Sequence, residues 1–497
     1  MSLKLGWSEV SITPPKKVYL AGQFYERISE YVETEITVTA MAVDSCGSHM
    51  VICSCDLEGI GDNLVVETRK RLAGVDGLDA NNVIIHATHS HTSIDYYSER
   101  KINLGTSSLS ILSQLLAEAN GKQDEAPKAE PNPDVMDSRE ALLWLADKIA
   151  EAAKSAWENR KPAYYTNEFG RAAVGMNRRV CYSDGSAKMW GDTNTATFVE
   201  LEGGNDSGIE LIYTFDENKE LTGIVANVAC PSQVVEQRSF ISSDYWGKVK
   251  ILLRERFGED LFVLGLCSPA GDQCPRDLIR WVDPETPIKD PNVIRENVTL
   301  RKADPSMYDI KGTWKIGKRI SREIIDVYDD INKDELKSDG MFCHKTMMLD
   351  MPVRRVTPAE YEAAKRKIEE FAGKAGEISF ADNAAMHVYA GTIARYRAQE
   401  EYDLYPVEVH IARLGDIAFA TSSFELFLDF GNIIRARSHA QQTFLIQLSN
   451  GAHGYLPTEK AERGGHYSAY VSSGVTGHEG GDILVRKTVE EINKMFS

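Results

Sequence analysis

A pair of histidines two positions apart follows an apolar segment near the start of the chain. His89 and His91 come shortly after Val83–Ala87, a run with the composition of a buried strand. Along an extended backbone, residues two apart project to the same face, so we expect both imidazoles to point the same way. Such a pair is typical of a divalent metal site, or of one ligand beside a general base or hydrogen-bond donor. Buried or solvated histidines without a chemical role are the alternative interpretation.

A turn that contains glycine and two prolines follows a second apolar segment, Leu261–Cys267. The turn carries Ser268 and Cys274, each directly before a proline. A hydroxyl or thiol that is exposed on such a turn could act as a nucleophile. A serine or cysteine before a proline can equally be a plain turn residue, so both interpretations stay open.

A carboxylate and two tyrosines follow later strand-like segments. Glu425 comes after Ile417–Thr421 and before a helix-like stretch, where a carboxylate either complements the helix dipole or acts as a ligand or base. Tyr455 follows Thr443–Leu448 in a glycine-rich loop, and Tyr467 comes twelve positions later. Tyrosines in such loops are often packing or surface residues, so the pattern alone does not assign them a role.

The elements that must position these residues alternate between two hydrophobic patterns. Strand-like runs occupy Glu35–Val43, Met50–Cys55, Val83–Ala87, Leu261–Cys267, Ile417–Thr421 and Thr443–Leu448. Apolar residues recur at helical spacing in Asn63–Leu72, Ala141–Trp157, Pro358–Phe371 and Asn383–Gln399. This alternation predicts an α/β fold with a largely buried sheet. We expect one large domain over residues 1–497, with polar insertions at Glu118–Arg139 and Asp283–Asp304.

Composition restricts the partners of the chain. Its 497 residues carry a formal net charge of −18, which disfavours binding to nucleic acid and anionic bilayers. No apolar run reaches the roughly 18 residues of a membrane span. The eight cysteines lack zinc-finger spacing, and Cys53 and Cys55 are expected to be buried thiols. We therefore expect a soluble protein with a small-molecule substrate, cytoplasmic as the sequence stands or exported if a leader has been removed; the oligomeric state stays open.

Six motifs, taken in order, resemble the catalytic domain of the neutral ceramidase family of zinc-dependent amide hydrolases. They are the opening segment Gly6–Pro14, Thr88-His89-Ser90-His91 (Thr-His-Thr-His in the family), Asn177-Arg178, Gly271-Asp272-Gln273-Cys274-Pro275 (Gly-Asp-x-Ser-Pro), Ser423-Phe424-Glu425 (Pro-Gly-Glu), and the pair Tyr455 and Tyr467. Order and rough spacing match over essentially the whole chain. The resemblance implies a large mixed-sheet catalytic domain with helices and long insertions, without the immunoglobulin-like domain that ceramidases carry at the C-terminus.

The resemblance also implies roles for individual residues. It places a zinc ion on His89, Cys230, Glu425 and Tyr455. His91 corresponds to a substrate-contacting or second-layer histidine, and Arg178 and Tyr467 to groups that hold the substrate or stabilise an oxyanion. Cys274 falls at the family's serine nucleophile. Zinc would lower the pKa of a bound water or hydroxyl and polarise the carbonyl.

Two of these positions depart from the family pattern. The second zinc histidine is replaced by Cys230, fourteen residues before Asp244. Cys230 is a thiolate ligand, or the site prefers another metal, or the metal is lost and Cys230 is an ordinary buried cysteine. The thiol of Cys274 could attack a carbonyl, ligate the metal or do neither, with Ser268 as the fallback nucleophile.

The resemblance implies a zinc-dependent hydrolase that cleaves an amide or related bond. The absent C-terminal domain and the acidic charge favour a small or polar substrate, such as an N-acyl sugar, over a lipid in a bilayer. Two alternatives remain: an enzyme that works in the same cleft without metal, and a catalytically silent relative that binds a small polar ligand there.

Overall fold

The structure is a computed structural model that describes residues 3–23, 25–102, 112, 114–116, 118, 132–279, 281–282, 302–303, 307–373 and 380–497. Most of the two insertions expected at Glu118–Arg139 and Asp283–Asp304 lies outside the described residues. None of the described helices is both long enough and apolar enough to cross a membrane.

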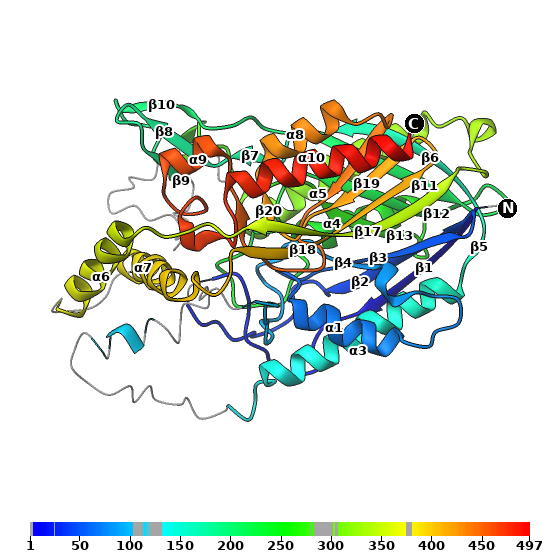
Figure 1. Cartoon of the computed structure of the whole chain (residues 1–497). Helices are drawn as coiled ribbons and strands as arrows, with labels where there is room; N and C mark the ends of the chain where they lie inside the picture. Colours follow the sequence, from blue (N-terminus) through cyan, green and yellow to red (C-terminus); the bar gives the residue numbers. More distant parts are fainter. Residues whose placement is uncertain are drawn as a thin grey trace.

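The first of the three larger sheets in the described residues carries the histidine pair at its edge. Its strand order is β4-β3-β2-β1-β5, and β3 and β4 run parallel. Two helices cover its outer face (Figure 1). The strands are β1 (Lys4–Ser11), β2 (Thr37–Ser45), β3 (Ser48–Cys55), β4 (Val83–Ala87) and β5 (Lys161–Pro162), and the helices are α1 (Asp62–Leu72) and α3 (Ser138–Glu158).

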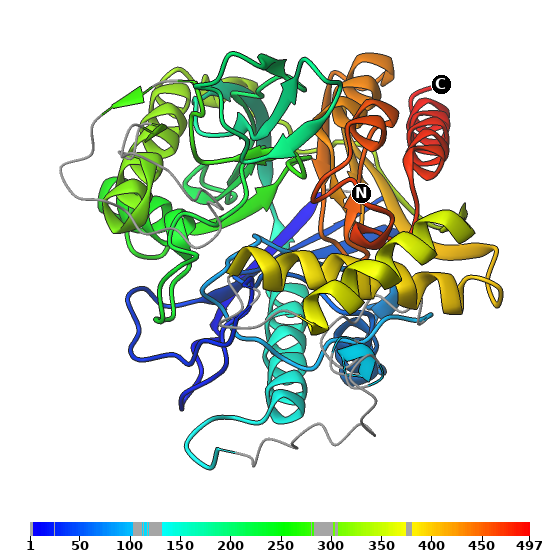
Figure 2. The same cartoon turned by 90° about the vertical axis from the view of Figure 1, so that its left-hand side faces the viewer.

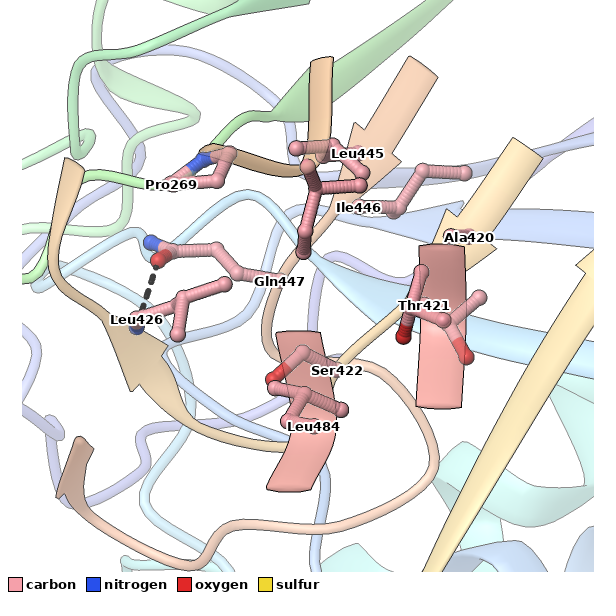
Figure 3. A pocket seen from close by; sticks show the side chains of 11 residues that line it. Pro269, Ala420, Thr421, Ser422, Leu426, Leu445, Ile446, Gln447 and Leu484 are labelled. Atoms are coloured by element: carbon pink, nitrogen blue, oxygen red, sulfur yellow. Dashed lines mark hydrogen bonds between the residues drawn. The ribbon is translucent and has the colours of Figure 1, made fainter. Parts of the chain in front are cut away.

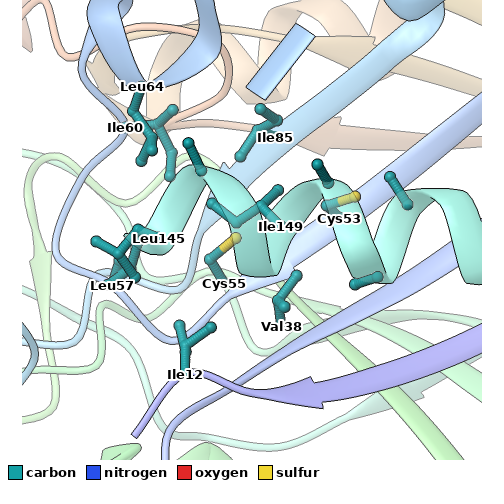
Figure 4. Close-up of a cluster of buried hydrophobic side chains, with 14 of the residues drawn as sticks. Ile12, Val38, Cys53, Cys55, Leu57, Ile60, Leu64, Ile85, Leu145 and Ile149 are labelled. Carbon is teal, nitrogen blue, oxygen red and sulfur yellow. The ribbon is translucent and has the colours of Figure 1, made fainter. Parts of the chain in front are cut away.

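Helix α3 shows why this layer forms. The side chain of Asp137 accepts hydrogen bonds from the backbone N–H groups of Arg139 and Glu140, which caps the helix start. Its buried residues, from Ala141 to Trp157, recur at helical spacing and face the sheet. Cys53 and Cys55 lie under this helix as buried, unpaired thiols, as expected (Figure 4).

The second and third sheets are also mixed, and each has its own helices. The second has the order β13-β12-β11-β6, with α4 and α5 packed on it. The third has the order β17-β18-β19-β21, with α8 and α10 packed on it. The bounds are β6 (Tyr164–Arg171), β11 (Gly208–Phe215), β12 (Leu221–Val228), β13 (Phe262–Cys267), α4 (Asp244–Phe257), α5 (Asp309–Asp329), β17 (Phe342–Pro352), β18 (Leu404–Leu414), β19 (Ile417–Thr421), β21 (Gln442–Ile446), α8 (Leu428–Arg437) and α10 (His478–Met495).

The inner faces of the three sheets share one buried core. It includes Trp7 of β1, Ile84 of β4, Leu264 of β13 and Phe419 of β19, all of them 6% exposed or less. The parallel pairs β3–β4, β12–β13 and β19–β21 are therefore held side by side in the middle of the molecule. The predicted mixed α/β fold is confirmed, and so are the six predicted strands and the four predicted helices. The strands Val83–Ala87 and Ile417–Thr421 have the predicted bounds, and the ends of the other elements are shifted.

Backbone hydrogen bonds join the carboxyl ends of these strands. The N–H of Ala87 donates to the carbonyl of Leu448, and the N–H of Gln447 donates to the carbonyl of Cys267. His86 of β4 contacts the ends of both other strands. Its Nδ1 contacts the carbonyl of Gln447, just after β21, and its Nε2 accepts the N–H of Cys267, at the end of β13. Residues that follow β4, β13 and β21 consequently meet at one place, as is usual for chemistry in α/β folds.

An antiparallel helix pair stands apart from the three sheets. Helix α6 (Pro358–Ala372) packs against α7 (Phe380–Ala398), as Figure 2 shows in yellow. The start of α6 is fixed by a capping box, in which Thr357 and Glu360 satisfy each other's backbone N–H groups.

Candidate active site

The structure brings the two predicted histidines together, but not through an extended strand. Strand β4 ends at Ala87, and His89 has a left-handed φ of 67°. The prediction of convergence is therefore right and its stated cause is wrong, because a tight turn and not the strand repeat aims the rings. Their Nε2 atoms lie 3.2 Å apart, and the ring planes meet at 82°.

His89 is held by a backbone carbonyl on one side and a carboxylate on the other. Its Nδ1–H donates to the carbonyl of Glu58 at 2.6 Å, and its Nε2 lies 3.4 Å from Glu425 Oε2. Burial alone would lower the pKa of His89, but the carboxylate of Glu425 outweighs it and raises the pKa to about 9. Because Nδ1 is occupied by the Glu58 carbonyl, Nε2 is the nitrogen that can contact a metal or a substrate.

His91 is packed on three sides. Its Nδ1 lies 3.1 Å from Glu236 Oε2. A Cβ at Gly22 would lie 2.5 Å from the His91 ring, so only glycine leaves room for the imidazole there. Burial and then the neighbouring charge of His89 lower the pKa of His91. His91 is therefore a neutral imidazole beside a charged one.

Glu425 and Tyr455 are register partners in a short parallel pair, β20 (Glu425–Leu426) with β22 (Tyr455–Leu456). The hydroxyl of Tyr455 lies 3.1 Å from that of Tyr467. Helix α8 starts only at Leu428, and the Glu425 carboxylate contacts His89 and Arg178. Of the two interpretations of Glu425, these contacts favour the ligand or base over the helix-dipole partner.

Arg178 reaches the same place from a third part of the chain. The pair β7 (Met176–Asn177) and β14 (Gln273–Cys274) holds it against the Gly271 turn, where its Nη2 donates to the Gly271 carbonyl at 3.0 Å. The same nitrogen lies 3.4 Å from the Tyr455 hydroxyl and 4.0 Å from Glu425 Oε2. The guanidinium and the His89 imidazolium together hold the pKa of Glu425 below its ordinary value, although burial opposes them. We call His89, Glu425, Arg178 and Tyr455 the paired side of the site.

Cys230 and Cys274 are the two positions that depart from the family pattern, and we call them the thiol side of the site. Both are fully buried. Cys274 Sγ lies 3.2 Å from the Arg276 carbonyl, and Cys230 Sγ lies 3.5 Å from the Val174 carbonyl. Burial raises the pKa of Cys274 to about 12, against the opposing charge of Arg178, and raises that of Cys230 well above its ordinary value. Each thiol is therefore a protonated donor to a carbonyl.

Ser268, the fallback nucleophile, is buried against helix α8. It is 1% exposed, and its hydroxyl accepts a hydrogen bond from Arg435 of α8. A small apolar cavity lies on the same side, lined by Pro269, Leu426 and Gln447 among others, and none of the predicted site residues lines it (Figure 3).

Sequence reasoning missed the residues that hold the histidines. Glu236 contacts His91 and is 4% exposed, although it follows two valines in the segment just after Cys230. An acidic residue that directly follows an apolar run next to a candidate ligand is the signal that could have identified it. The carbonyl of Glu58 has no such signal, because any residue supplies one.

The paired side offers donor atoms of the types that bind a metal ion. No group of three or more His, Cys, Asp or Glu side chains suited to a metal occurs in the described residues. A metal on His89 and Glu425 would therefore need Tyr455, the register partner of Glu425, as its third donor. The bond from His89 Nδ1 to a carbonyl is typical of histidines that ligate metal through Nε2. Two ligands on one tetrahedral zinc lie about 3.3 Å apart, and His89 Nε2 and Glu425 Oε2 are separated by 3.4 Å. The ligand role of Cys230 stays a prediction.

Comparison with known proteins supplies the wider context. No protein-family model matches the chain, and no curated protein matches it by sequence. The solved structure of neutral ceramidase from Pseudomonas aeruginosa superposes with a TM-score of 0.67 over 100% of this chain and 74% of that chain, at 15% identity. The structure of a ceramidase complexed with C2 superposes with a TM-score of 0.67 over 100% of this chain and 75% of that chain, at 14% identity. At this identity the likeness establishes the fold.

Proposed function

Because the chain has the fold of the neutral ceramidases, we propose that it is a hydrolase that cleaves an amide or related bond in a small or polar substrate at the site around His89. The observation that carries the proposal is the meeting of His89, Arg178, Glu425 and Tyr455 from separate parts of the chain. Buried and mutually charged groups of this kind are costly to a fold and are concentrated at functional sites.

We propose that the activity depends on zinc. His89, Glu425 and Tyr455 would hold the ion, with Cys230 as the candidate fourth ligand. A bound zinc ion polarises a carbonyl oxygen and makes a hydroxyl or water more acidic. The metal would take the place of the proton on His89 Nε2, since a ligating imidazole must be neutral on that nitrogen.

The remaining residues bind and orient the substrate. The Arg178 guanidinium and the Tyr467 hydroxyl are donors beside Tyr455, so they can hold a carbonyl oxygen and stabilise the negative charge that develops on it. His91 is neutral and can accept a proton, with Glu236 beside Nδ1 to fix its orientation. Burial of these groups excludes bulk water and strengthens each interaction.

Cys274 is the candidate nucleophile. Its thiol must lose its proton before it can attack a carbonyl, and the nearby Arg178 favours that loss while burial opposes it. Substitution by serine keeps a nucleophilic atom there, and substitution by alanine removes it. A Cys274→Ala protein with unchanged activity would assign the attack to water.

The test is hydrolysis of a panel of N-acyl compounds by zinc-loaded protein. We expect His89→Ala and Glu425→Gln to lose activity by about 10²–10³-fold, because each removes a group that acts on the developing charge. His439→Ala is the matched control, since His439 is exposed on the surface. Full activity in both site variants would contradict the proposed site, and no turnover of any panel member would favour a silent binding protein.

A further inference from the structure

Three glutamines lie next in sequence to residues that contact His91. Gln23 follows Gly22, which packs on the imidazole ring. Gln233 follows Ser232, whose carbonyl accepts the backbone N–H of His91. Gln237 follows Glu236, whose carboxylate lies beside Nδ1. None of the three belongs to the motifs that suggested the fold.

Arg27 ties these segments together. One of its terminal nitrogens donates to the carbonyl of Glu236 at 2.6 Å, and the other donates to the carbonyls of His91, at 2.7 Å, and Ala21. Arg27 is itself 5% exposed, so the clamp is internal to the protein. Arg27 thereby ties the loop before Gln23 and the segment that contains Glu236 to the backbone of His91.

Each of these glutamines has at least one amide atom that is buried without a partner among the described residues. Both polar atoms of Gln23, the Nε2 of Gln233 and the Oε1 of Gln237 have no hydrogen-bond partner there. Gln233 is only 2% exposed, and its Oε1 is reached by Arg178 at 3.5 Å. Buried amides are nearly always hydrogen-bonded in folded proteins, because leaving them unpaired costs free energy.

Other buried glutamines behave differently. Gln399, Gln442 and Gln447 each use both amide atoms in hydrogen bonds to described residues. Gln273, in the turn before Cys274, leaves Oε1 unpaired. Among these buried glutamines, the unpaired amide atoms therefore occur in segments of the candidate active site, where a ligand can complete them.

The unpaired atoms around His91 include both donors and acceptors and carry no charge. Hydroxyl groups both donate and accept, whereas an anion only accepts and a hydrocarbon does neither. We propose that Gln23, Gln233 and Gln237 form a subsite for the hydroxyl groups of a neutral, hydroxyl-rich N-acyl substrate. The inference rests on the proposed function for the position of the substrate, and it makes these glutamines determinants of specificity.

The experiment compares equilibrium binding of two acetamides on a six-membered ring. N-acetylglucosamine carries hydroxyl groups, and N-cyclohexylacetamide has none. A site built to bond hydroxyls rejects the analogue that lacks them, so we expect the wild-type protein to bind N-acetylglucosamine at least about 10-fold more tightly. Gln233→Leu removes the amide at similar size and should reduce that ratio to about 2-fold or less.

Two further variants keep the test decisive. Gln23→Leu alters a less buried amide, so it provides the answer if Gln233→Leu does not fold. Gln399→Leu is the matched control, because the side-chain amide of Gln399 bonds to the backbone of Val356, and this variant should keep the wild-type ratio. An unchanged ratio in Gln233→Leu and Gln23→Leu overturns the proposal, as does a wild-type protein that binds the two compounds equally or binds neither. Selective binding without turnover of any amide would leave the subsite intact and contradict the hydrolase.

Discussion

The paired side and the thiol side of the site lie close together but differ in how burial is compensated. Around His89 and Glu425, opposite charges offset the cost of burial and keep both groups ionised. Around Cys230 and Cys274, burial dominates and both groups stay protonated. The charge of Arg178 lowers the pKa of groups on both sides, but only on the paired side do the opposite charges outweigh the effect of burial. Being close to Arg178 is therefore not enough to ionise a side chain. Whether the side chain is ionised depends on the balance between the cost of desolvation and the gain from pairing with an opposite charge.

The larger consequence of this difference is a pH dependence of stability in the metal-free protein. The folded state keeps the proton of His89 up to about pH 9, whereas an unfolded histidine loses it near pH 6.5. This contribution is complete below about pH 6.5 and is lost as the pH rises to about 9, by up to about 3 kcal/mol.

Chemical denaturation of metal-free protein across this range measures the effect. We expect the free energy of unfolding to fall more in the wild-type protein than in His89→Gln, which cannot take up the proton. His439→Gln, changed at an exposed position, should follow the wild type. Equal slopes in the wild type and His89→Gln would mean that Glu425 does not hold a charged imidazole.

The smaller effect concerns the thiols. Cys46 is exposed, and its pKa is lowered by a hydrogen bond from Ser45, whereas burial raises the pKa of Cys230 and Cys274. Alkylation by iodoacetamide at pH 7.5, followed by peptide mass spectrometry, should modify Cys46 at least about 10-fold faster than either site cysteine. Rapid modification of Cys274 would show an activated thiolate and would remove the distinction between the two sides.

Local hydrophobic patterns predicted the helices and strands, because these elements form where the spacing of apolar residues suits them. The apolar run Val83–Ala87 became β4 with the same bounds, and the helical spacing after Asp62 became α1. The meeting of His89, Glu425 and Tyr455 followed from motif order and a family resemblance. Composition alone could not bring together residues more than 300 positions apart.

The roles of individual polar residues were harder to predict. His86 lies in the same segment as His89 and His91, yet it joins its own sheet to the other two through Gln447 and Cys267. The partner of His91, Glu236, comes from a segment more than 140 positions away. Which histidine meets a carboxylate and which meets a carbonyl is decided by tertiary packing, so the sequence of β4 and its following turn does not contain the answer.

Zinc content tests the central claim most directly. Wild-type, His89→Ala, Cys230→Ser and His439→Ala proteins would be washed with chelator, resupplied with zinc, freed of excess metal and measured by elemental analysis. The account predicts about one zinc per chain in the wild type and in His439→Ala, and its loss in His89→Ala. Loss in Cys230→Ser would add the thiol as a ligand. A wild-type protein that takes up no zinc, or an His89→Ala protein that keeps it, would contradict the account.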